Sequence, residues 1–345
     1  MANPFNISFG KEPSRLIART SQINSVIETF TSDTPSTQAY MITGVRGAGK
    51  TVTMTHIEHE LAKDARWISV PLNPNTNLLE GLASHLCENK ELALAFTKAD
   101  INISFFSLNA SIVNEKPAAT VEVQLLKMLK VVKKLKKKVL ITIDEVIKNK
   151  QMIEFASAYQ TFVREDYPVF LLMTGLFENI RNLQNENTLT FLYRTPRIDL
   201  KPLGIVGMSS DYKEVFNIPN EEAEEMARFT KGYSYAFQAL GYLKWEEKES
   251  LEKITPKFDS IMEDFVYEKI WSELSSGDKK VLSAIAKNGG RMKTSDVQAA
   301  TGNTSGSFST YRKRLSEKGL IDISDYGYVE LTLPRFAEII NAWNY

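Results

Sequence analysis

The sequence has few of the features that mark secreted, metal-binding or membrane proteins. Cys87 is the only cysteine among 345 residues, which excludes a disulfide scaffold or a multi-cysteine metal site and indicates a reducing compartment. Residues 1–16 contain no apolar stretch of the kind found in secretory signals. Apolar runs such as 169–173 are far shorter than the roughly 18 residues of a membrane span. We therefore expect a cytoplasmic protein that does not bind a membrane.

Net charge is absent as well. The chain has 42 lysine and arginine residues against 42 aspartate and glutamate residues, which argues against a surface coated uniformly for nucleic acid. The average conceals segments of opposite sign, because residues 1–210, 211–273 and 274–345 carry net charges of +4, −7 and +3. Local basic surfaces are compatible with this balance, and the last two segments have charges that attract each other.

Short apolar runs alternate with helical patterns over the first 200 residues. Runs of strand length occupy 38–44, 67–72, 139–143, 169–173 and 198–200. Helical spacing occupies 51–63, 77–96 and 118–137, while 101–115 alternates as further strands do. This order predicts a parallel α/β sheet covered on both faces. From 211 to 273 the pattern is helical and acidic. After residue 275, three predicted helices precede an alternating segment at 321–333, which is the order of a winged helix-turn-helix.

Residues 44–51 read GVRGAGKT and fit the phosphate-binding pattern G-x-x-x-x-G-K-[ST]. Glycines let backbone N–H groups curl around phosphate oxygens, and the helix that follows directs its positive end at the same anion. Lys50 would reach the β- and γ-phosphates, and Thr51 would bind Mg²⁺. The alternative is an ordinary glycine-rich turn. The predicted ATP-binding residues here are Gly44, Val45, Arg46, Gly47, Ala48, Gly49, Lys50 and Thr51.

A second motif follows about 90 residues later, where the apolar run 139–143 ends in Asp144 and Glu145. An aspartate at a strand tip can hold Mg²⁺. A glutamate beside it can orient and deprotonate the water that attacks the γ-phosphate. Thr174, at the end of another apolar run, could touch the same phosphate or water. The alternatives are solvated acids after a strand and a threonine that merely caps a turn.

The segments GVRGAGKT, LITIDE and LLMTG resemble the P-loop, acidic and sensor-1 segments of AAA+ ATPases. They are most similar to the archaeal-type group related to origin-recognition proteins, whose members place a winged helix after the ATPase module. The resemblance implies ATP and Mg²⁺ as cofactors. It also implies an ATPase core at 1–205, a helical lid at 206–270 and a winged helix-turn-helix domain at 271–345.

The resemblance extends to the start of the chain. Residues 16–19, LIAR, resemble the opening segment of this group, which lies near the adenine and usually reads Gly-Arg-Glu. Ile17 and Arg19 are the implied contacts. Ala18 and Thr20 stand where the group has glycine and glutamate, which weakens the implied adenine contact.

An arginine finger is implied near residue 194. Residues 192–194, LYR, resemble the segment in which an arginine completes the ATP site of a neighbouring subunit, so Arg194 implies self-association. An arginine in that role stabilises charge on the transferring phosphoryl group. A surface arginine paired with a carboxylate is an equal alternative, and Arg197 is a nearby competitor for the role.

Residues 230–241, TKGYSYAFQALG, resemble the lid helix that carries the sensor-2 arginine in many AAA+ proteins. No arginine occurs between Arg228 and Arg291. Either the lid senses nucleotide in another way, or hydrolysis is weak. The aromatic residues of this segment are interpreted as lid packing.

The third helix of the predicted winged domain is the candidate DNA reader. Small polar side chains could approach base edges, and its cations could contact phosphates. Use of the same domain for protein contacts is the alternative. The predicted DNA-binding residues are Ser307, Thr310, Arg312, Lys313 and Arg314.

Two other clusters receive plainer interpretations. Residues 127–138 contain seven lysines, which we interpret as the solvated face of an amphipathic helix in preference to a nucleic-acid or membrane patch. The histidines, His56, His59 and His85, show no metal-site spacing.

The favoured function is an ATP-hydrolysing AAA+ switch coupled to duplex DNA by the winged helix. The alternative is a nucleotide-regulated signalling or scaffold ATPase with little turnover, whose winged helix contacts protein.

Overall fold

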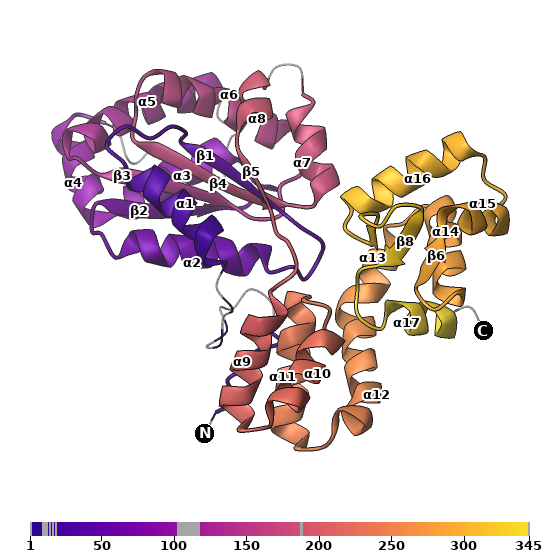
Figure 1. Ribbon diagram of the computed structural model, residues 1–345. Coiled ribbons are helices and arrows are strands. Elements are labelled where there is room, and N and C mark those ends of the chain that lie inside the picture. The colour runs from indigo at the N-terminus through magenta and orange to yellow at the C-terminus, as the bar shows by residue number, and fades with distance from the viewer. Residues whose placement is uncertain are drawn as a thin grey trace. The chain divides into compact units, whose positions relative to one another are not determined.

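The computed structural model describes residues 2–8, 13, 15, 17, 19–101, 118–186 and 189–343 (Figure 1). It divides into two compact units. The sheet unit comprises Thr20–Thr43 and Lys50–Asp199, and the helical unit comprises Met1–Arg19, Gly44–Gly49 and Leu200–Tyr345. Among the described residues, no helix is long and apolar enough to cross a membrane.

Five parallel strands form the centre of the sheet unit, in the order β2-β3-β4-β1-β5. Their bounds are β1 Ala39–Thr43, β2 Trp67–Leu72, β3 Lys138–Ile143, β4 Val169–Gly175 and β5 Arg197–Asp199. Each corresponds to one of the predicted apolar runs. The predicted parallel α/β sheet is confirmed.

The helices of the sheet unit are α1 Thr20–Thr31, α2 Lys50–Ala62, α3 Leu78–Glu88, α4 Lys90–Lys98, α5 Ala118–Lys134, α6 Lys150–Arg164, α7 Phe177–Gln184 and α8 Thr190–Arg194. The single helix predicted at 77–96 is wrong. Asn89 has an extended backbone, and its side chain accepts a hydrogen bond from the Leu92 N–H at 3.1 Å, which starts α4 as a separate helix. The strands predicted at 101–115 lie outside the described residues from 102 onward.

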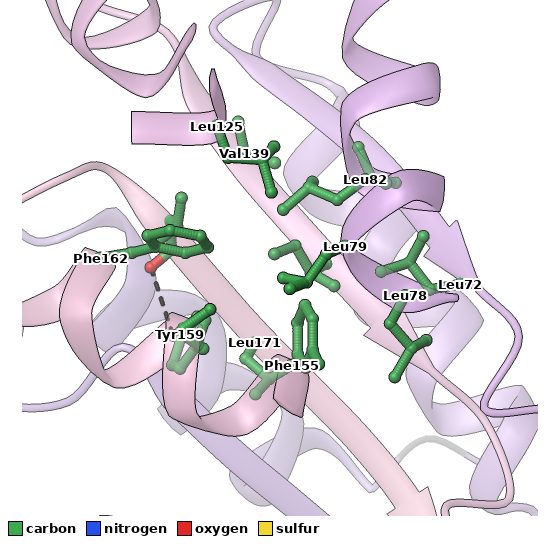
Figure 2. Packing of buried hydrophobic residues seen from close by; sticks show 14 of the residues in the cluster. Leu72, Leu78, Leu79, Leu82, Leu125, Val139, Phe155, Tyr159, Phe162 and Leu171 are labelled. Atoms are coloured by element: carbon green, nitrogen blue, oxygen red, sulfur yellow. Dashed lines mark hydrogen bonds between the residues drawn. The ribbon is translucent and has the colours of Figure 1, made fainter. Parts of the chain in front are cut away.

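The sheet is buried on both faces, as continuous apolar runs predict. On one face, alternate strand residues such as Val139 and Leu171 pack against α3, α5 and α6 (Figure 2). On the other face, Phe30 of α1 stacks with strand aromatics, including Trp67 and Phe170. Packing on both sides fixes the register of the strands, and therefore fixes which residues emerge at their carboxyl ends.

The helical unit begins with α9 Ile205–Phe216, α10 Asn220–Phe229, α11 Ser234–Glu247 and α12 Leu251–Met262. A π-helical turn, η2 Glu263–Tyr267, continues α12 into α13 Glu268–Ser272. Phe5 from the start of the chain packs against Tyr212 and Phe237 of these helices. The predicted helical, strand-free character of 211–273 is therefore confirmed. The packing of the N-terminal segment was not predicted.

The rest of the helical unit has the arrangement of a winged helix (Figure 1). Its elements are α14 Ser276–Lys287, β6 Arg291–Lys293, α15 Thr294–Thr301, α16 Ser305–Glu317, β7 Ile321–Asp322, β8 Tyr328–Leu331 and α17 Phe336–Trp343. The strands form an antiparallel sheet in the order β6-β8-β7. Three helices and the β7–β8 pair were predicted, whereas β6 and α17 were not.

One apolar cluster runs without interruption through the lid helices and the winged helix. Polar contacts reinforce it, including a Tyr267 hydroxyl that donates to the Pro334 carbonyl at 2.7 Å. Two ion pairs join the acidic segment 211–273 to the basic segment 274–345. In one, Arg335 of the basic segment pairs with Asp259 at 2.8 Å, but in the other the cation is Lys231 of the acidic segment, which pairs with Glu330 at 3.6 Å. Apolar packing therefore explains why the lid helices and the winged helix pack together better than the opposite net charges of the two segments do. The domain boundaries at 205/206 and 270/271 stay predictions.

Candidate functional site

The predicted phosphate loop connects β1 to the first turn of α2. Gly47 and Gly49 have φ angles of +77° and +88°, a left-handed region that side chains disfavour, which explains the glycines. Lys50 is the first residue of α2 and is 9% exposed. The N-terminus of a helix favours an anion. Residues 44–49 group with the helical unit, while Lys50 and Thr51 belong to the sheet unit.

The sheet unit brings three predicted site residues into one hydrogen-bond network. The Thr51 hydroxyl donates to Asp144 Oδ2 at 2.7 Å, and the Thr174 hydroxyl donates to Asp144 Oδ1. The parallel register pairs Ile143 of β3 with Met173 of β4, so the residues that follow them, Asp144 and Thr174, come together. The motifs that lie far apart in the sequence therefore converge on one carboxylate.

The donor set of this network suits Mg²⁺. A hydroxyl oxygen and a carboxylate oxygen are hard ligands, and Mg²⁺ commonly takes one or two protein oxygens and completes its shell with water and phosphate oxygens. Thr51 and Asp144 supply such a pair. No group of three or more His, Cys, Asp or Glu residues suited to a metal occurs in the described ranges.

Glu145 has an unusual backbone for the residue after a strand. Its φ is +51°, which is costly for a side-chain-bearing residue. Its N–H donates to Asp144 Oδ1 at 3.0 Å and to the Thr174 hydroxyl at 3.2 Å, and these contacts hold the turn. The side chain is exposed. The predicted base is thus presented to solvent by a turn anchored on the same carboxylate.

Arg19 contacts the phosphate loop within the helical unit. Its guanidinium donates to the Ala48 carbonyl at 3.1 Å and to the Ser234 hydroxyl at 3.2 Å, and also to the Lys201 carbonyl. Burial lowers the pKa of Arg19 to about 10, so it remains a cation at neutral pH. Ile17 is partly buried against the lid cluster. An adenine contact by either residue stays a prediction.

The two arginines that compete for the finger role differ in their surroundings. Arg197 pairs with Asp199 at 2.8 Å and stacks on the Phe177 ring at 4.5 Å. Arg194, at the end of α8, is exposed and has no ion-pair partner in the part of the chain that the structure describes. The neighbouring Tyr193 is 74% exposed. Arg194 is therefore the more available of the two for a second subunit.

The residues predicted to read DNA lie on different sides of α16. Phe308 and Leu315 are buried in the domain core, so the opposite side of the helix faces solvent. Ser307, Thr310 and Lys313 are exposed there. Apolar periodicity alone identifies this outward face.

Arg314 is directed to the domain interior. Its guanidinium donates to Asp278 Oδ1 at 2.7 Å and to the Ser275 hydroxyl at 3.1 Å. Asp278 is 2% exposed and forms a capping box with Ser275 at the start of α14. Through these contacts Arg314 ties α16 to α14, although its side chain is still 36% exposed, and its predicted contact with DNA stays a prediction. The Ser-x-x-Asp spacing at 275–278 was a signal that the sequence interpretation missed.

Arg312 and the wing complete this surface. Arg312 is half-buried, and its Nε has no hydrogen-bond partner among the described residues. The loop between β7 and β8, which forms the wing, carries Asp325, paired with Arg291. Tyr326 at its tip is 98% exposed. The one acid of this loop is thus paired with an arginine, and the exposed ring at its tip offers no cation to a phosphate.

The lysine-rich segment is mostly a solvated face of α5, as interpreted. Lys137 pairs with Glu91 at 2.7 Å, and Lys138 lies over the Trp67 ring at 5.1 Å. The remaining lysines are exposed, with no ion pair to another described residue, and they are Lys127, Lys130, Lys133, Lys134 and Lys136.

Comparison with known proteins finds the same architecture in archaeal ATPases. A Walker-type ATPase of Pyrococcus abyssi matches with a TM-score of 0.67 and 13% identity, over 94% of this chain and 96% of that one. The ORC2 protein of Aeropyrum pernix, in its ADPNP–ADP complexes, matches with a TM-score of 0.64 and 14% identity, over 97% and 96%. Cdc6p of Pyrobaculum aerophilum matches with a TM-score of 0.51 and 13% identity, over 97% and 96%.

Sequence comparisons add less. A model for a domain of unknown function (DUF8462) matches residues 264–340, which span the winged helix. No curated protein matches the sequence significantly. The resemblance seen in the motifs is thus confirmed as a fold along nearly the whole chain. This chain has the fold of the archaeal-type, origin-recognition-like AAA+ ATPases, with a parallel P-loop sheet, a helical lid and a C-terminal winged helix.

Proposed function

We propose that this protein binds ATP with Mg²⁺ and hydrolyses ATP as a conformational switch coupled to duplex DNA binding. The observation that carries the ATPase part is the convergence of Thr51 and Thr174 on Asp144. Similar structures include one with ADPNP and ADP, which supports nucleotide binding by this fold.

Each residue of the network has a distinct task in this proposal. Mg²⁺ held near Thr51 and Asp144 would neutralise charge on the β- and γ-phosphates. Lys50 binds the same phosphates. Glu145 orients the attacking water and accepts its proton, while Thr174 holds the Asp144 carboxylate in place.

Two variants test the ATPase proposal. Lys50→Ala should weaken ATP binding by at least about a hundredfold, because a charge-assisted phosphate contact is lost. Glu145→Gln should retain ATP binding and lower turnover by about 10²–10⁴-fold. Unchanged ATP affinity in Lys50→Ala, measured by calorimetry, would refute the site. Unchanged turnover in Glu145→Gln would remove that residue from the mechanism.

The DNA part of the proposal rests on the outward face of α16. Ser307 and Thr310 are small polar residues that fit near base edges, and Lys313 can contact a phosphate. Arg312 is included as the cation next to Lys313 on the same helix, where it is half-buried. Arg314 is left out because Asp278 holds it. Binding of a duplex should weaken steeply with salt, and salt-independent binding would argue against phosphate contacts.

Self-association is proposed through Arg194. An exposed arginine without an ion-pair partner in the described chain, next to an exposed Tyr193, suits insertion into a second subunit's ATP site. A catalytic rate that rises with protein concentration would support this arrangement, and a constant specific activity would oppose it.

A second candidate function is favoured by the wing. The bare Tyr326 ring at its tip suits a protein partner better than DNA, because exposed aromatics are enriched at protein interfaces. In that case the winged helix docks a protein and turnover is low. Failure of the purified protein to bind any duplex at low salt would favour this candidate.

A further inference from the structure

The lid contacts the phosphate loop through three consecutive carbonyl groups of the loop. The Tyr233 hydroxyl donates to the Arg46 carbonyl. The Tyr235 N–H donates to the Gly47 carbonyl at 3.1 Å. The Ser234 hydroxyl donates to the Ala48 carbonyl at 3.0 Å. Three successive residues at the start of α11 thus bind three successive residues of the loop, all within the helical unit.

The fit at Tyr233 is close. A Cβ atom at Gly47 would overlap the Tyr233 hydroxyl, so the tyrosine requires glycine there. Tyr233 is 6% exposed, and burial holds the pKa of its hydroxyl well above the usual value. The hydroxyl therefore stays protonated and acts as a donor throughout the physiological pH range.

The segment 233–235 is itself anchored through the residue that precedes it, Gly232. Gly232 has a φ of +75°, and a Cβ there would lie 2.7 Å from the Leu203 carbonyl oxygen. The Gly232 carbonyl accepts a hydrogen bond from the Leu203 N–H at 2.7 Å. Arg19 adds a donor to the Ala48 carbonyl. The segment that carries the donors at 233–235 is thus held by Leu203, just before α9, as well as by the helix α11 that it begins.

The geometry of the peptide bond makes these carbonyl contacts relevant to phosphate. In a trans peptide, the C=O of one residue and the N–H of the next point in opposite directions. Fixing the carbonyls of Arg46 and Ala48 therefore fixes the direction of the N–H groups of Gly47 and Gly49. Backbone N–H groups of such a loop bind phosphate oxygens.

We propose that Tyr233 and Ser234 are positioning residues that couple nucleotide binding to the lid through the loop backbone. The lid then registers nucleotide without an arginine of its own between Arg228 and Arg291. This inference rests on the proposed ATP site, because it assigns a regulatory contact to the same loop.

The experiment compares Tyr233→Phe with Tyr235→Phe. Tyr233→Phe removes the hydroxyl that donates to the Arg46 carbonyl and keeps the aromatic ring, so affinity for ATP and ADP should fall about tenfold. Tyr235→Phe is the matched control, because its hydroxyl has no hydrogen-bond partner among the described residues and its backbone N–H is retained. Equal losses of affinity in the two variants would overturn the assignment to Tyr233.

Hydrogen exchange supplies a readout that a general loss of stability would not reproduce. In ligand-free protein, amides of residues 44–50 should exchange faster in Tyr233→Phe than in wild type, with exchange of the sheet strands unchanged. In wild type, ADP should slow exchange at 232–240, and Tyr233→Phe with Ser234→Ala should abolish most of that response.

These measurements separate the two hypotheses. If wild type binds ADP and Tyr233→Phe matches it in affinity and in lid exchange, the inference is overturned and the ATP site stands. If wild type binds no nucleotide, the proposed function fails, and faster ligand-free exchange at 44–50 in Tyr233→Phe still tests the clamp. Unchanged exchange at 44–50 in this variant would overturn the assignment of Tyr233 as a positioning residue.

Discussion

The carboxyl ends of β3 and β4 and the outer face of α16 both present polar side chains, but their bonding differs. At the strand ends, Asp144 accepts hydrogen bonds from Thr174 of β4 and from Thr51 of α2. On α16, Lys313 is exposed, while Arg314 is bonded inward to Asp278. The side chains around Asp144 are therefore ordered by one another, whereas the exposed side chains of α16 are ordered only by the helix that carries them.

The largest expected effect concerns completion of the ATP site by a second subunit. Arg194→Ala should lower turnover by about 10³-fold if the arginine acts on the transferring phosphoryl group. Mixing Arg194→Ala with Glu145→Gln should restore part of the activity, because one variant keeps the base and the other keeps the finger. An ATPase assay of the mixture measures this, with Arg197→Ala as the control. Absence of rescue at any protein concentration would argue against an arginine acting between subunits.

The next effect concerns the network itself. Asp144→Asn removes the charge that Thr51 and Thr174 address, so turnover should fall on the order of a hundredfold and depend less on Mg²⁺ concentration. Steady-state ATPase titrated with Mg²⁺ is the measurement. A wild-type Mg²⁺ dependence in Asp144→Asn would mean that the ion is held elsewhere.

The third prediction tests whether the contact between Arg314 of α16 and Asp278 stabilises the domain. Asp278→Ala removes the capping box of α14 and leaves Arg314 without its partner, so the free energy of unfolding should fall by about 2 kcal/mol. Lys280→Ala, on an exposed part of the same helix, should change it by less than about 0.5 kcal/mol. Denaturant unfolding compares them. Equal stabilities would show that the Arg314 contact has no structural role.

The smallest expected effect is on DNA binding. Replacing Arg312 and Lys313 by alanine should lower the slope of log affinity against log salt by about 2, if each contacts one phosphate. The matched control is Lys130→Ala with Lys134→Ala on α5, which removes the same charge from a surface interpreted as solvated. Fluorescence anisotropy of a labelled duplex over a range of salt concentrations gives the slopes. An equal decrease of the slope in both double variants would mean that DNA is attracted by positive charge in general and not by the outer face of α16.

The fold and the hydrogen-bond network at Asp144 were predictable because their signals are local and chemical. Apolar runs of strand length had to be buried, and Asp144 followed one of them directly. The meeting of Asp144 with Thr174 also followed, since neighbouring parallel strands end at the same edge. Asn89 shows the limit, because its capping of α4 broke one periodic segment into two helices.

Three-dimensional partners were harder to predict. From its charge, Arg314 was grouped with Arg312 and Lys313 as a DNA contact. In the structure its position on α16 places it beside the buried Asp278 instead. The aromatic residues of the lid segment were interpreted as packing. Their hydrogen bonds go to backbone carbonyls, which every residue type has, so the sequence gives no sign of these acceptors. The packing of Phe5 on the lid was missed for a different reason, because it joins side chains that lie far apart in the sequence.

The central claim is that ATP turnover at the Asp144 network is coupled to duplex binding by the winged helix. ATPase activity measured with and without duplex DNA, across protein concentration, tests it most directly. We expect turnover that rises with protein concentration, changes on addition of duplex, and is lost in Glu145→Gln. Turnover that ignores duplex DNA in wild type, or that persists in Glu145→Gln, would contradict the account.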